Sequence, residues 1–278
     1  MTRILVIDGN EIATRTKHVS VGGTDSGDGY AATLKRLDKD IETDIVRPAD
    51  GVVKLPDGVA IKDFDGAVIT GSALNIYSLE PAVERQVELV KEVFAAGVPC
   101  FGSCWGLQVG VTAAGGSVVR NPRGREFGFA RRIMLNAQGR DHAMFQGKPE
   151  VFEAVTVHVD TVDSLPPGGV PLAHNHMGLQ AAEIRFTNGG SFWGVQYHPE
   201  YSVAEAAAMA RRYADVLIRD GLVRDRADLD ALAADFTALD ANPGDARLAW
   251  RFGVGESITN RDVKLAELRN WLDQKVLK

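Results

Sequence analysis

Short apolar runs alternate with helical patterns over the first two-thirds of the chain. This alternation is typical of a parallel sheet whose strands are connected by helices. Apolar residues in the second predicted helix recur at helical spacing, Pro81 suits its first turn, and Gly97 suits its C-cap. The pattern predicts strands at 4–7, 43–46, 67–70 and 99–102, and helices at 30–37 and 81–96.

From about residue 118 the pattern changes to strands separated by turns, followed by one helix at 203–218. The predicted strands are 127–135, 151–159, 170–175, 179–186 and 191–197. We therefore expect a doubly wound α/β domain over residues 1–222, with a mostly parallel sheet, flanking helices and an added antiparallel portion.

The tail, residues 223–278, has a different pattern. Leu229, Leu232, Phe236 and Leu239 lie at helical spacing, 242–244 (Asn-Pro-Gly) breaks the chain, and a second apolar stripe follows. This predicts a helical C-terminal extension. Two readings stay open: an appendage packed on the domain, or a docking surface for a partner or a second subunit.

Two segments carry candidate chemistry. Residues 102–108 (Gly-Ser-Cys-Trp-Gly-Leu-Gln) follow an apolar strand and precede a predicted helix. A cysteine at such a turn is exposed to attack a substrate, and the helix N-terminus favours its thiolate. Residues 195–200 (Val-Gln-Tyr-His-Pro-Glu) place His198 and Glu200 two apart, so both point to the same side of an extended chain. Cys104, His198 and Glu200 thus predict a nucleophile, a base and an orienting carboxylate.

The pattern Gly-x-Cys-x-Gly-x-Gln followed by Gly-x-Gln-x-His-Pro-Glu resembles the class I glutamine amidotransferases. These enzymes hydrolyse the side-chain amide of glutamine through a γ-glutamyl thioester. The resemblance covers roughly residues 1–215 and is closest to stand-alone members that look like the amidotransferase domain of GMP synthetase. It implies the same three catalytic residues that the spacing predicts.

The resemblance also implies groups that bind substrate or stabilise the oxyanion. The backbone N–H of Trp105 is one expected oxyanion donor, and Gly71 or Ser72 supplies the other. This chain has Thr-Gly-Ser at 70–72, where many relatives carry two glycines and a proline, so the choice between the two stays open. Gln108 matches the glutamine that helps to hold the substrate, and His158 matches a more weakly marked substrate position.

Composition and charge exclude several other classes. The net charge is −6 with no long basic run, which argues against nucleic acid as a partner. The three arginines within residues 120–125 are interpreted as an exposed turn. The two cysteines, Cys100 and Cys104, give no disulfide framework, and Cys100 is expected to be a small buried hydrophobe. We expect no signal peptide, no membrane span and a cytoplasmic location.

We also expect no metal and no cofactor. His174 and His176 lack a spaced carboxylate or cysteine partner, so they are read as part of a loop. The glycine-rich segment 21–29 lacks the lysine and the spacing of a P-loop. It is interpreted as a connection after the first strand, either inert or acting as a lid or acceptor-binding loop.

Three functions follow, and the first is the main interpretation, with the other two as alternatives. The first is a glutamine amidotransferase that delivers ammonia to an acceptor or to a separate synthetase, because this chain has no ATP-binding signature. The second is a stand-alone γ-glutamyl peptidase, amide hydrolase or transferase that uses the same triad. The third is a non-catalytic regulatory module. The sequence also leaves open whether the chain forms a homo-oligomer.

Overall fold

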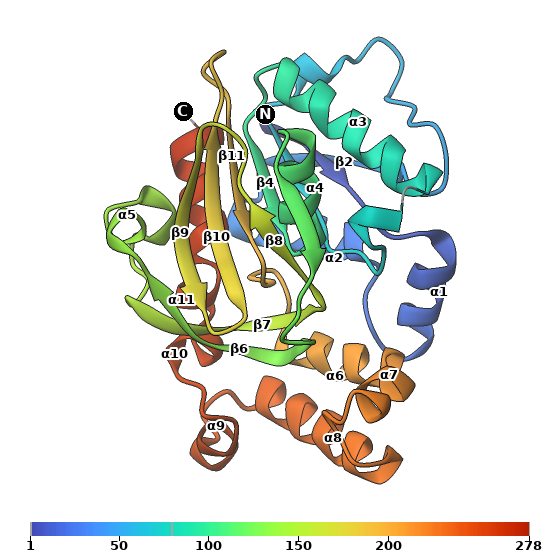
Figure 1. Ribbon diagram of the computed structural model, residues 1–278, viewed down its shortest axis with the longest axis vertical. Coiled ribbons are helices and arrows are strands. Elements are labelled where there is room, and N and C mark those ends of the chain that lie inside the picture. The colour runs from blue at the N-terminus through green and yellow to red at the C-terminus, as the bar shows by residue number, and fades with distance from the viewer. Residues whose placement is uncertain (1, 79, 278) are drawn as a thin grey trace.

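The computed structural model describes residues 2–78 and 80–277, which form a nine-stranded sheet covered by helices on both faces (Figure 1). The strand order is β2-β1-β3-β4-β11-β10-β9-β6-β7. The first five strands in this order run parallel to one another, and the remaining pairs are antiparallel. This confirms the expected fold class.

The parallel half is the buried centre of the molecule. Its strands are β1 (Thr2–Ile7), β2 (Ile41–Val46), β3 (Gly66–Ile69), β4 (Cys100–Ser103) and β11 (Ser191–Val195). Every residue of β3, β4 and β11 is buried, as expected for parallel strands covered on both faces. Because β3, β4 and β11 are parallel neighbours, their carboxyl ends meet at one edge of the sheet.

The antiparallel half contains β6 (Glu126–Leu135), β7 (Val151–His158), β9 (Gly169–Asn175) and β10 (Gly178–Arg185). A separate two-stranded sheet pairs β5 (Ser117–Arg120) with β8 (Asp160–Ser164). The sequence analysis missed this small sheet, because both strands are short and partly exposed, so they carry little apolar signal.

The sheet separates two hydrophobic cores, each covered by helices. α3 (Pro81–Ala95) and α4 (Trp105–Ala113) pack on one face of the sheet, against residues such as Leu5 and Ile7. α2 (Ser26–Leu37) and the end of the chain pack on the other face, against Ile4 and Val6. The inward-facing side chains of β1 thus alternate between two cores, as the period of a strand requires.

The expected helices differ from the observed ones in four places. α1 (Ile12–Ser20) and the short α5 (Ala137–Arg140) were not predicted. α2 begins at Ser26, inside the glycine-rich segment that was read as a connection, because the Asp25 side chain caps it by accepting from the backbone of Gly27 and Asp28. The single helix expected at 203–218 is two helices, α6 (Val203–Arg212) and α7 (Ala214–Arg219), with a break at Tyr213.

The C-terminal extension packs on the domain along both of its apolar stripes. Phe236 of α8 makes an edge-to-face contact with Phe129 of β6, with ring centroids 5.3 Å apart. Trp271 is fully buried in the core beneath the sheet. The helices of the extension are α8 (Arg226–Ala241), α9 (Ala246–Phe252), α10 (Glu256–Thr259), α11 (Arg261–Lys264) and α12 (Ala266–Trp271), followed by a short π-helix over Leu272–Val276. Both apolar stripes are therefore packed on the domain, as the appendage interpretation expects. The domain boundary at residue 222 stays a prediction.

Glu267 of the extension has two buried polar contacts with the domain, one just before β7 and one just after β11. Glu267 of α12 lies 2.7 Å from Lys148 Nζ, and both side chains are almost fully buried. Glu267 also accepts a hydrogen bond of 2.6 Å from the Tyr197 hydroxyl. Tyr197 immediately precedes His198, so the extension holds the chain next to a candidate catalytic residue.

Candidate active site

Cys104 lies at the turn between β4 and α4, at the carboxyl edge of the sheet. Its φ is 55° and its ψ is −103°, a backbone conformation that residues other than glycine rarely adopt. The backbone N–H of Cys104 donates a 2.7 Å hydrogen bond to the Val195 carbonyl at the end of β11. The strained turn therefore holds the thiol in one place at the start of a helix.

Gly102 and Gly106 flank this turn, and close packing explains both. A Cβ at Gly102 would lie 2.5 Å from the backbone carbon of Gly106. A Cβ at Gly106 would lie 2.5 Å from the Ile69 carbonyl oxygen. The two glycines let α4 pack directly on β3 and β4, while the positive φ belongs to the cysteine between them.

His198 and Glu200 follow β11, the parallel neighbour of β4. The Nδ1 atom of His198 lies 2.7 Å from Oε1 of Glu200, and both side chains are buried. The imidazole also stacks on the Tyr201 ring, with centroids 3.9 Å apart and planes 1° from parallel. The imidazole ring is thus held at one edge by Glu200 and on one face by Tyr201.

The surroundings of His198 favour its charged form. Burial by itself lowers the pKa of His198, but the charge of Glu200, together with the charge and hydrogen bond of the Cys104 side chain, raises it to about 10. Because the imidazole is then protonated at neutral pH, it offers a positive partner to a thiolate at Cys104.

Glu200 has a second partner that the sequence analysis missed. The Ser103 hydroxyl donates a 3.0 Å hydrogen bond to Oε2 of Glu200, and the Tyr30 hydroxyl lies 3.1 Å from the same serine oxygen. Ser103 directly precedes Cys104 in the sequence motif, so its position close to the site could have been predicted. Tyr30 comes from α2, and no local signal pointed to it.

Gly71, one of the two residues considered for the oxyanion loop, lies against the His198 ring. A Cβ at Gly71 would be 2.5 Å from Cε1 of His198. The Asn10 side chain, which sequence reasoning also missed, donates a 2.8 Å hydrogen bond to the Gly71 carbonyl and fixes this loop. Trp105 begins α4, where the first backbone N–H groups have no partner within the helix.

A cavity of about 110 Å³ opens beside Cys104. Ser72, Gln108 and His158 line it, so the structure brings these three sequence candidates to the thiol. Gln108 is buried, and its amide lies 3.5 Å from the Asp160 carbonyl and 3.4 Å from Gln196 Oε1.

His158 contributes a wall of this cavity and is held by protein groups at both ring nitrogens. Nδ1 lies 2.9 Å from the Asp160 carbonyl oxygen, and Nε2 lies 2.9 Å from Oε2 of Glu126. In this arrangement the imidazole has both hydrogen-bonding positions occupied before a substrate enters.

Arg125 also lines the cavity, which corrects the reading of 120–125 as an exposed turn. Its side chain is 11% exposed, donates a 3.1 Å hydrogen bond to Asp220 and lies over the Tyr213 ring. Arg120 and Arg123 are exposed as expected. The same cavity contains the buried Asp160 carboxylate, which accepts from Asn75 and Tyr77. A cation and an anion thus face one small space.

The second cysteine is a buried core residue. Cys100 is fully buried within β4, and burial raises the pKa of its thiol. Both cysteines are free. This confirms the expectation of a small buried hydrophobe at position 100.

His174 lies in β9 and His176 in the turn after it, and both are exposed. Within residues 2–78 and 80–277, no group of three or more His, Cys, Asp and Glu side chains is arranged to hold a metal ion. In the same residues, no helix has the length and apolar character to span a membrane.

Comparison with known proteins agrees with this geometry. The family model described as "Glutamine amidotransferase class-I" matches residues 24–213. The chain belongs to the class I glutamine amidotransferase family. The match begins just before α2 and ends at Tyr213, so it includes Cys104, His198 and Glu200 and leaves out α7 and the extension.

Two kinds of relatives differ in how much of the chain they match. A gamma-glutamyl-L-1-hydroxyisopropylamide hydrolase of a Pseudomonas species is 34% identical over 280 residues, which cover 99% of this chain and 93% of that protein. A glutamine-hydrolyzing GMP synthase of Thermomicrobium roseum is 31% identical over 204 residues, 72% of this chain but 35% of the synthase. The chain thus spans about a third of that synthase's length.

Solved structures support the fold. A glutamine amidotransferase of Thermotoga maritima has a TM-score of 0.63 at 20% identity, with 100% of this chain and 99% of that chain covered. A glutamine amidotransferase of Methylobacillus flagellatus has a TM-score of 0.57 at 22% identity, with 98% and 91% covered. These amidotransferases share the mixed sheet and its flanking helices.

Proposed function

We propose that this protein is a stand-alone γ-glutamyl amide hydrolase that uses Cys104 as its nucleophile. The observation that carries the chemistry is the strained Cys104 turn, together with the buried His198 imidazole hydrogen-bonded to Glu200. The substrate class is supported by the hydrolase relative, which matches nearly the full length of both chains, including the C-terminal extension. The GMP synthases support the shared amide chemistry over part of their length.

In the proposed reaction the Cys104 thiolate attacks the γ-carbonyl carbon of the substrate. The C–N bond breaks as His198 donates its proton to the departing amine, and a C–S bond forms. Water then attacks the γ-glutamyl thioester, and His198 accepts its proton. The C–O bond forms, the C–S bond breaks, and glutamate leaves.

The remaining residues position these groups. Glu200 holds the imidazole in its tautomer and stabilises the positive charge. The backbone N–H of Trp105 and the Gly71–Ser72 loop stabilise the oxyanion. Gln108 contacts the glutamyl end of the substrate, and His158 shapes the wall beside it.

Glutamine is the competing substrate, because the GMP synthase relatives are named as glutamine-hydrolyzing. Delivery of ammonia to a separate synthetase would require a partner, whereas hydrolysis of a γ-glutamyl amide needs this chain alone. The two functions share the thioester and differ in the leaving group, so rates on different amides distinguish them.

The test is to measure kcat/KM for γ-glutamyl isopropylamide, a γ-glutamyl dipeptide and glutamine. We expect the alkylamide to be hydrolysed at least about tenfold more efficiently than glutamine, a difference of about 1.4 kcal/mol. Cys104→Ala should abolish the activity, while Cys100→Ala, the matched control in the preceding strand, should retain it. Equal or higher efficiency on glutamine would contradict the proposed substrate class. Activity that survives Cys104→Ala would contradict the proposed chemistry.

A further inference from the structure

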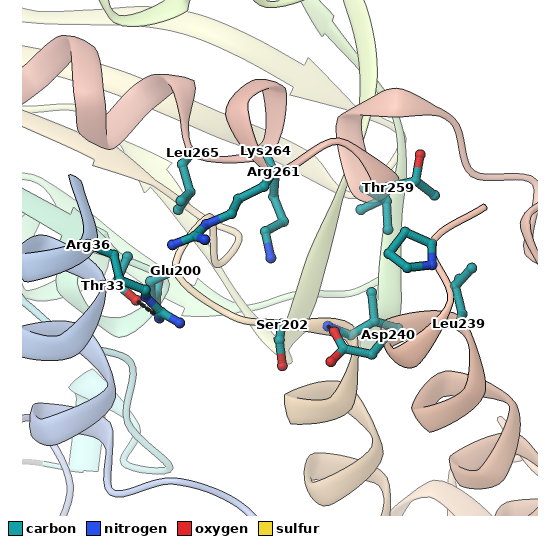
Figure 2. A pocket seen from close by; sticks show the side chains of 13 residues that line it. Thr33, Arg36, Glu200, Ser202, Leu239, Asp240, Thr259, Arg261, Lys264 and Leu265 are labelled. Atoms are coloured by element: carbon teal, nitrogen blue, oxygen red, sulfur yellow. Dashed lines mark hydrogen bonds between the residues drawn. The ribbon is translucent and has the colours of Figure 1, made fainter. Parts of the chain in front are cut away.

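A second cavity, of about 230 Å³, has Glu200 in its lining. It is enclosed by α2, the start of α6, the end of α8 and the α10–α11 region of the extension (Figure 2). It shares no lining residue with the Cys104 cavity. It is therefore a separate space that the extension helps to form, and the substrate chemistry proposed above does not use it.

Three cations surround this cavity. Arg36 comes from α2, while Arg261 and Lys264 come from α11 on the opposite side (Figure 2). Arg36 donates to the Thr33 hydroxyl at 2.9 Å, and Lys264 donates to the Tyr201 carbonyl at 2.9 Å. Both acceptors are uncharged. Among residues 2–78 and 80–277, none of the three cations lies within 4.0 Å of a carboxylate oxygen.

The two carboxylates in the lining are already engaged elsewhere. Glu200 accepts from His198 and Ser103. Asp240 accepts a 2.8 Å hydrogen bond from the backbone N–H of Val203. The cavity lining therefore has three cations and two carboxylates, and each carboxylate accepts a hydrogen bond from a group other than these cations.

The cations also act on one another across the cavity. Burial lowers the pKa of Lys264 to about 8; Arg36 and Arg261 add to this shift, and Asp240 and Glu200 oppose it. Like charges that destabilise one another are stabilised when an anion is placed among them.

The rest of the lining indicates the kind of anion. Hydroxyl groups of Thr33, Ser202 and Thr259 offer neutral hydrogen bonds, and an apolar wall is formed by Val203, Leu239, Pro243, Ile258 and Leu265. A neighbouring cavity of about 240 Å³ shares Thr33, Arg36, Glu200 and Ser202, so there is room beyond the cations for an organic group.

We propose that this cavity binds a small organic anion, with a carboxylate or phosphate group held by Arg36, Arg261 and Lys264 and a short apolar part against Leu239 of α8 and Ile258 of α10. Because the cations come from α2 on one side and α11 on the other, the bound anion joins the extension to the domain.

The test is calorimetric titration of the full chain with succinate and with inorganic phosphate, at pH 7 and at constant ionic strength maintained with chloride. We expect one anion to bind per chain and the bound form to unfold at a higher temperature. Arg36→Gln and Lys264→Gln should each weaken binding about tenfold or more, because each removes a charge-assisted hydrogen bond. Arg36 is exposed on α2, so its variant keeps the test valid if Lys264→Gln fails to fold.

Two controls assign the site. Arg247→Gln removes an exposed arginine of α9 outside the cavity and should leave binding unchanged. Arg125→Gln removes the cation of the Cys104 cavity and should also leave binding unchanged. Binding of succinate alone identifies a carboxylate site, and binding of phosphate alone a phosphate site. The proposal is overturned if neither anion binds in excess of chloride, if both cavity variants bind as the wild type does, or if Arg125→Gln abolishes binding.

Discussion

The Cys104 cavity and the extension-side cavity are built in different ways. On the Cys104 side the space is small, and its groups are held by short hydrogen bonds at the carboxyl ends of three parallel strands. On the extension side the space is larger, and its cations have only neutral partners. The first region is prepared to position reacting atoms. The second has unmatched charge, which is typical of a place that a ligand completes.

Glu200 is where the comparison is sharpest, because it lines the extension-side cavity and also hydrogen-bonds to His198. Glu200→Gln should reduce kcat about 10²- to 10⁴-fold, because the amide no longer stabilises the imidazolium or fixes its tautomer. The same variant should still bind succinate or phosphate in the extension-side cavity, where the cations remain. Steady-state kinetics on a γ-glutamyl amide and calorimetry on the same preparation measure the two effects. Loss of anion binding with unchanged kcat would reverse the assignment of the two regions.

Ser103 tests whether the catalytic side depends on precise support. Ser103→Ala removes the donor to the second oxygen of Glu200, a charge-assisted hydrogen bond that contributes about 1.5–3 kcal/mol. We expect kcat to fall about tenfold with little change in KM, because substrate contacts are untouched. Ser103→Thr, which retains the hydroxyl, should recover part of the rate. A change in KM with normal kcat would show that Ser103 acts on substrate binding instead.

Lys264 tests the charge of the extension side through stability and not through catalysis. Its folded pKa, about 8, lies below the usual value of 10.5, so the unfolded chain binds more protons between these limits. This lysine should therefore make stability rise as pH increases from about 8 to 10.5, by at most about 1.4 kcal/mol per pH unit, and should reduce stability below pH 8. Lys264→Met should lack this rise when unfolding by urea is compared across the range. An identical pH profile in wild type and variant would contradict the lowered pKa.

The same two regions differ in how much of them the sequence predicts. The Cys104 side follows from two short segments, since strand ends and residue spacing bring Cys104, His198 and Glu200 to one edge. The supporting contacts from Tyr30 and Asn10 depend on where α2 and the loop after β1 pack, and no local pattern encodes that placement. Arg125 was misread for the same reason: a turn rich in arginine is exposed on average, yet this side chain packs over Tyr213.

Elements with an ordinary apolar pattern were predicted to within a few residues, as α3 illustrates. α1 was missed because its pattern is inverted. Its buried residues are the polar Arg15 and His18, whereas Ile12 and Val19 are 65% and 52% exposed. Arg15 pairs with Asp50, and His18 with Glu205 of α6. Long-range polar contacts therefore hold this helix, and its sequence lacks the apolar periodicity that predicts a helix.

The measurement that tests the central claim most directly is intact mass spectrometry after rapid acid quench of the enzyme during turnover of γ-glutamyl isopropylamide. The account predicts a fraction of chains heavier by one γ-glutamyl group, with the added mass located by peptide mapping on Cys104 and absent from Cys104→Ala. A matching adduct on Cys100 or on another residue, or hydrolysis of the amide by Cys104→Ala at the wild-type rate, would contradict it.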